Sequence, residues 1–85
     1  MTNKIYHLMR RSTPNAKADE AYGFVVVAQS PVKARQIVAE APKGDGPGDE
    51  GPDVWRDAAQ SFCVCVGQAG RGQSPRILLR DYNGC

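Results

Sequence analysis

The feature that most constrains this chain is the stretch from Tyr22 to Gln29, which is rich in β-branched and aromatic residues and is apolar on both faces of an extended strand. A strand of this kind needs apolar neighbours on both sides, so the sequence predicts a central strand here. Its uninterrupted apolar core, Phe24–Ala28, has only five residues. A bilayer span needs about 20, so we expect no membrane crossing.

A helix is predicted directly after this strand. The Ser30 side chain can cap free backbone amides, and Pro31 suits the first helical position. Apolar residues then recur at helical spacing at Ala34, Ile37, Val38 and Ala41. Pro42 and Gly44 end the pattern.

Alternation of side chains predicts strands over residues 4–11 and 61–67, with turn chemistry at Ser12–Asn15 after the first, and the apolar run Ile77–Leu79 predicts another strand over residues 76–82. One or two helical turns in residues 53–59 would fold Trp55 back over the core. The order ββαββ predicts an α+β fold: two β-hairpins and one helix, arranged as a four-stranded, mostly antiparallel sheet with the helix on one face. A chain of 85 residues has room for one domain, residues 1–85.

A single helix covers one face of such a sheet and leaves the other face open. Depending on the register, the open face would carry Tyr6, Leu8, Val25, Val27 and Cys63. An exposed apolar patch usually marks a protein contact, and a homo-oligomer would cover it.

A Gly/Pro-rich acidic loop is predicted at residues 42–53, and we expect it to be flexible. Residues 44–57 hold five acidic residues and one arginine, a net charge of −4, whereas the rest of the chain is net positive. Such a loop either folds onto the basic body or offers a docking point to a basic partner. The candidate partner-binding residues are Asp49, Glu50, Asp53, Trp55 and Arg56.

Nucleic-acid binding is the alternative. Eleven Lys and Arg against nine Asp and Glu give a formal charge of +2, well short of the strongly basic balance of a dedicated nucleic-acid binder. A stripe of cations along the sheet edges could still contact phosphates. Its candidate residues are Arg10, Arg11, Arg71, Arg76 and Arg80.

Metal binding and catalysis find little support. His7, Cys63, Cys65 and Cys85 equal the ligand count of a tetrahedral zinc site, but one residue alone separates the two paired cysteines, which is too few for the usual structural spacing. His7 is the only histidine and has no fixed spacing to a nucleophile. We therefore expect no metal, no cofactor and no enzymatic activity. The first residues lack the apolar stretch of a secretory signal, which favours a cytoplasmic location.

Over most of residues 21–84, the chain resembles small proteins of actinobacteria and their phages whose function is generally unassigned, and several short segments carry the resemblance. They are Ser30–Arg35, Gly48–Gly51 leading into Val54 and Trp55, Cys63, and Leu79–Asn83. The resemblance implies a phage accessory protein that binds and blocks a host machine. Together with the open sheet face, it leads us to expect a small, non-catalytic protein-binding module, with nucleic-acid binding as the alternative.

Overall fold

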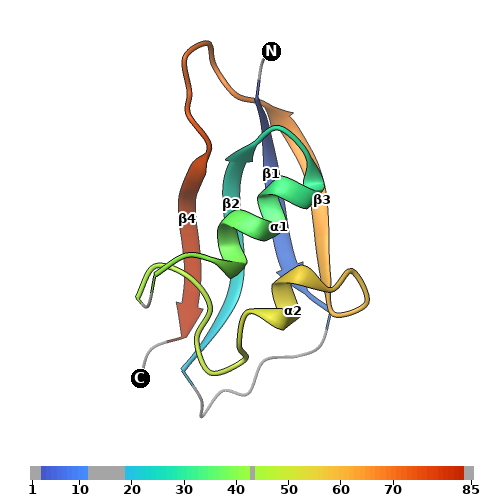
Figure 1. The fold of residues 1–85 in the computed structure, drawn as a ribbon, viewed down its shortest axis with the longest axis vertical. Helices are drawn as coiled ribbons and strands as arrows, with labels where there is room; N and C mark the ends of the chain where they lie inside the picture. Colours follow the sequence, from blue (N-terminus) through green and yellow to red (C-terminus); the bar gives the residue numbers. More distant parts are fainter. Residues whose placement is uncertain (1–2, 12–18, 43, 84–85) are drawn as a thin grey trace.

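The predicted strands and helices form close to the expected residues. The structure, a computed structural model, describes residues 3–11, 19–42 and 44–83. Its elements (Figure 1) are β1 (Lys4–Arg10), β2 (Glu20–Ala28), α1 (Pro31–Ala39), α2 (Asp53–Arg56), β3 (Ser61–Gln68) and β4 (Arg76–Asn83). The turn predicted at Ser12–Asn15 lies outside the described residues.

The four strands form one antiparallel sheet in the order β3-β1-β2-β4. The predicted α+β class, with a four-stranded antiparallel sheet and a helix on one face, is confirmed. So is the central position of β2, which pairs with β1 on one side and with β4 on the other.

The last two strands differ from the expected hairpin, because β3 and β4 lie at opposite edges of the sheet. The connection between them, residues 69–75, crosses the end of the sheet where β1 begins and β2 ends (Figure 1). Seven residues can span about 23 Å when extended, whereas the two edge strands are only about 14 Å apart, so the length of the connection does not force a hairpin. Alternation identified the strands but not their partners.

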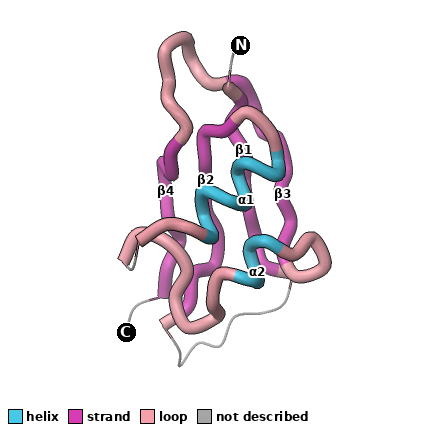
Figure 2. The backbone as a smooth tube through the Cα atoms, in the orientation of Figure 1, coloured by secondary structure: helices cyan, strands magenta, loops and turns pink. Residues whose placement is uncertain are grey.

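Both helices lie on the same face of the sheet (Figure 2). The Ser30 Oγ atom accepts a hydrogen bond from the Lys33 backbone at 3.2 Å, so the predicted cap is confirmed. The cluster of buried core residues comprises Tyr6, Leu8, Ala21, Phe24, Val26, Ala28, Ala34, Val38, Val54 and Trp55. Within the described ranges, no helix has the length and apolar character to cross a bilayer.

Arg35 joins the two helices to the beginning of β3. Its guanidinium donates to the backbone oxygen of Trp55 at 2.9 Å, and to the side chain and backbone oxygens of Ser61 at 2.7 and 2.8 Å. Ser61 is fully buried, and its hydroxyl donates to the Val54 backbone oxygen at 2.8 Å. One arginine therefore fixes α1, α2 and β3 relative to one another.

The register decides which side chains face the helices. Tyr6 and Leu8 belong to the core, and Cys63 packs against it, so the expectation that these three could lie on the uncovered face is wrong. Val25 and Val27 alternate with core residues of β2 and so point to the side opposite the helices. Val25 is half-buried there, whereas Val27 is only 1% exposed, so the expectation of an uncovered side chain is wrong for Val27.

Candidate functional site: the open face of the sheet

The open face, which is the surface of the sheet opposite α1 and α2, is built from rows of residues that pair across the strands. Backbone pairing places Val64, His7, Val25 and Leu79 in one row, in the order β3, β1, β2, β4. The neighbouring row consists of Phe62, Met9, Gly23 and Asp81. Both rows cross the whole sheet.

Large apolar side chains on these rows are accessible to solvent. The exposed fractions are 38% for Met9, 39% for Phe62, 47% for Val64 and 61% for Leu79. The opposite face of the same sheet is covered by a continuous core with both helices. An apolar surface of this extent on a small domain is typical of a protein contact.

A hollow lies beside Gly23. It has a volume of about 230 Å³ and is lined by His7, Gly23, Phe24, Val25, Leu79, Arg80 and Asp81. A Cβ atom on Gly23 would lie 2.8 Å from the backbone oxygen of Leu8, which is too close for any larger residue. The missing side chain therefore leaves a depression between His7 and Leu79.

Opposite charges stand at the two ends of the row that contains Gly23. The guanidinium carbon of Arg11 lies 3.8 Å from the centroid of the Phe62 ring, and its Nε donates to the Ala58 backbone oxygen at 2.9 Å. Asp81, on β4, is exposed. The apolar part of the open face thus has a positive end at β3 and a negative end at β4.

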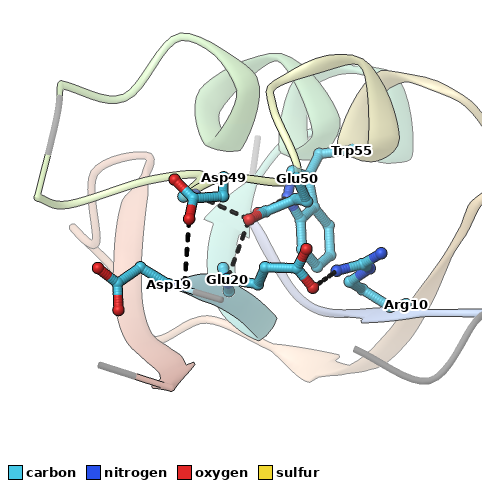
Figure 3. Close-up of polar contacts among 8 residues, drawn as sticks. Arg10, Asp19, Glu20, Asp49, Glu50 and Trp55 are labelled. Carbon is cyan, nitrogen blue, oxygen red and sulfur yellow. Dashed lines mark hydrogen bonds and ion pairs between the residues drawn. The ribbon is translucent and has the colours of Figure 1, made fainter. Parts of the chain in front are cut away.

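The acidic loop is attached to the helix-covered side through Glu50 (Figure 3). Its carboxylate accepts hydrogen bonds from the Trp55 Nε1 at 2.6 Å, the Gly48 backbone at 2.9 Å and the Ala21 backbone at 3.0 Å. Arg80 donates to two loop carbonyls, those of residues 44 and 46, at 2.8 Å each. The flexibility predicted for residues 42–53 stays a prediction, but this loop is joined to the body at several points.

The candidate partner-binding residues of this loop have different environments. Trp55 is fully buried and meets Phe24 edge to face, with ring centroids 4.9 Å apart. Trp55 and Glu50 therefore hold the loop in place and offer little surface to a partner. Asp49 is exposed and accepts from the Asp19 backbone at 3.2 Å, while the exposed residues Asp53 and Arg56 form an ion pair at 3.1 Å.

The structure does not bring the five arginines of the nucleic-acid alternative into one stripe. Arg10 is paired with Glu20 at 2.8 Å, and Arg80 holds the loop and stacks on a tyrosine ring. Arg11 directly follows the last residue of β1, whereas Arg76 begins β4 at the opposite end of the sheet. Arg71 is exposed in the connection between the edge strands.

The histidine and the described cysteines lie on different faces. His7 is on the open face, whereas Cys63 packs beneath the helices, where burial raises the pKa of its thiol. Cys65 is exposed, and Cys85 lies outside the described residues. Burial likewise raises the pKa of Tyr6. Among the residues that the structure places, no three potential ligands gather into a metal site.

Sequence reasoning missed the importance of Met9, Phe62 and Leu79. Alternation did group Phe62 with Val64 on one face of β3, and that was the available signal. Which face would meet the helices depends on the register of all four strands, and alternation within one strand does not contain that information.

Comparison with known proteins finds no matching family, no similar curated protein and no similar solved structure.

Proposed function

We propose that this chain is a small non-catalytic protein-binding module whose binding surface is the open face of the sheet. One observation carries the proposal: large apolar side chains are exposed across β1, β3 and β4 on one face, while the other face has its own complete core. Because removing apolar surface from water lowers the free energy, contact with an apolar surface of a protein partner would be favourable there.

The positions of the polar groups support a protein partner more than a nucleic acid. Phosphate binding requires cations that converge on one surface. Here Arg10 and Arg80 are engaged in contacts within the domain, and Arg76 stands at the far end of the sheet from Arg11. The central row of the open face carries three apolar residues, Val64, Val25 and Leu79, and one histidine, His7.

The non-catalytic part of the proposal is supported by the separation of the reactive groups. His7 points to the open face, while the side chains of Ser61 and Cys63 lie on the helix-covered side. A base beside a nucleophile is the arrangement that covalent catalysis needs. Free thiols at Cys63 and Cys65 suit the reducing cytoplasm in which we place the module. A phage-type inhibitor that covers an apolar site on a host protein is the narrower form of this proposal.

The test is affinity capture with three tagged versions of the chain: wild type, Val64→Glu and Val32→Glu. Val64 lies on the open face, whereas Val32 is a 72% exposed valine on α1, so the two substitutions introduce the same charge at exposed positions of different faces. Any protein bound through the open face, including an untagged copy of this chain, should be recovered with wild type and Val32→Glu and lost with Val64→Glu. Equal recovery with all three versions would overturn the proposal.

A further inference from the structure

We infer that the partner of the open face is a second copy of this chain, packed face to face about a two-fold axis that runs parallel to the strands between β1 and β2. The inference rests on the proposed function, because it names the occupant of the same surface. Such an axis places β1 opposite β2 of the second copy and β3 opposite its β4, since the strand order is β3-β1-β2-β4.

The central row is complementary to itself under this operation. Val64, at the β3 end, meets Leu79 of the second copy, and His7 meets Val25. By symmetry each contact occurs twice. Val64 and Leu79, the two most exposed side chains of the row, therefore bury each other at the edges of the interface. The half-buried residues His7 and Val25 pack against each other at its centre.

The next row provides a protrusion and a hollow at matching positions. Met9 is exposed on β1, and its neighbour in the row on β2 is Gly23, beside the hollow of about 230 Å³. The two-fold axis carries Met9 of one copy over Gly23 of the other. A methionine side chain is flexible and fills irregular apolar spaces well. Gly23, which allows β1 and β2 to lie close together, thus also leaves space for Met9 of the second copy.

The charges at the ends of this row also match. Asp81, on β4, comes to lie opposite the Phe62 position of the second copy, where the Arg11 guanidinium covers the ring. Two ion pairs would form at the rim of the interface. Pairs at an exposed rim contribute modestly to affinity, but they specify orientation.

A two-fold axis perpendicular to the strands fits less well. If this axis runs along the central row through Val25, it places Gly23 opposite Val27 of the second copy, because Gly23 and Val27 lie two residues before and two residues after Val25 on β2. Val27 is only 1% exposed and does not protrude, so the hollow would remain empty. An unfilled apolar hollow loses the contacts that make an interface stable. The parallel axis is therefore favoured.

The size of the face is sufficient for a weak but specific dimer. Four strands spaced about 4.8 Å apart, with about seven residues each at 3.3 Å, give a flat face of about 450 Å² per copy, and side-chain relief increases the accessible area further. The accessible surface buried on the two copies together is about 1,000 Å², close to the lower limit for specific interfaces. We therefore expect monomer and dimer to exchange upon dilution.

The experiment is sedimentation equilibrium over a wide range of protein concentration, with far-UV circular dichroism and thermal unfolding as checks of folding. Wild type and Val32→Glu should dimerise reversibly. Val64→Glu should raise the dimer dissociation constant by more than about 100-fold, because it buries two unpaired carboxylates in an apolar interface. A wild type that stays monomeric, or a Val64→Glu variant that dimerises as Val32→Glu does, overturns the inference.

A charge exchange tests the axis itself. Arg11→Glu and Asp81→Arg should each weaken the dimer by about three- to tenfold, and the double variant should restore it, because the reversed charges again face each other. Failure of the double variant to recover overturns the parallel two-fold arrangement. A monomeric wild type that still captures another protein through Val64 overturns this inference and supports the proposed function, whereas a monomer that captures nothing through that face overturns both.

Discussion

Replacing Glu50 by alanine removes the group that ties the acidic loop to the core. One carboxylate oxygen accepts from the backbone of Gly48 and Ala21, and the other accepts from the Trp55 indole (Figure 3). Ala21 and Trp55 are both fully buried. The two buried N–H groups would be left without the acceptor that they have in the folded protein.

The expected loss of stability follows from those two donors. A buried donor left unsatisfied costs about 1–3 kcal/mol, so with two such donors Glu50→Ala should lose about 2–6 kcal/mol of unfolding free energy. That is a large share of the about 4–13 kcal/mol expected for a domain of 85 residues. Asp49→Ala is the matched control, because the neighbouring exposed carboxylate accepts one bond at 3.2 Å; its loss should stay below about 1 kcal/mol.

Urea unfolding followed by fluorescence of Trp55, the only tryptophan, and by far-UV circular dichroism measures both variants. Glu50→Gln should fall between wild type and alanine, because an amide keeps one oxygen but turns an NH₂ group toward one of the N–H donors. The reasoning is refuted if Glu50→Ala unfolds at the same urea concentration as Asp49→Ala, with an unchanged slope.

Three further outcomes are expected. Arg35→Lys should lower the unfolding free energy by about 2–3 kcal/mol in the same urea assay, because an ammonium group cannot reproduce the forked hydrogen bonds to α2 and β3. The hydrogen bond from the Gln60 side chain holds the pKa of Asp57 below its ordinary value of 3.8. The Asp57 carboxylate therefore stabilises the fold above pH 3.8, and this contribution is lost as the pH falls through the lower pKa of the folded state. The difference in unfolding free energy between wild type and Asp57→Ala should become smaller in acid, and a difference that grows would contradict the direction of the pKa shift. Two single-cysteine variants, both with Cys85 replaced by serine, should differ in their reaction with a thiol reagent at neutral pH. The variant that keeps only Cys65 should react faster than the variant that keeps only Cys63, because the Cys63 thiol is partly buried and has a raised pKa. Equal reaction rates would contradict the buried position of Cys63.

The sequence predicted the elements well because their signals are local. Ser30 and Pro31 define the start of α1, and the apolar run of β2 requires a central position; both depend on residues that are close in the chain. The one-turn helix that carries Trp55 over the core was also predicted. These features do not depend on the remainder of the fold.

The pairing of strands and the open face could not be predicted in the same way. The contact of Leu8 with Cys63 joins residues about 55 positions apart, and nothing local favours it over a pairing of β3 with β4. The loop likewise required structural information, because the Glu50–Trp55 hydrogen bond depends on how the short helix α2 turns back. The candidate site was predicted only as an uncovered face, without the rows that compose it.

The strand order also has a consequence for biosynthesis. Both edges of the sheet come from residues 61–83, so a nascent chain that has left the ribosome only as far as α2 can form the β1–β2 pair but has nothing to flank it on either side. A ribbon of two strands is at best marginally stable in water. Completion of the sheet therefore awaits the synthesis of residues 61–83, and a polypeptide that stops after α2 would have two unprotected strand edges, each able to recruit a neighbouring chain.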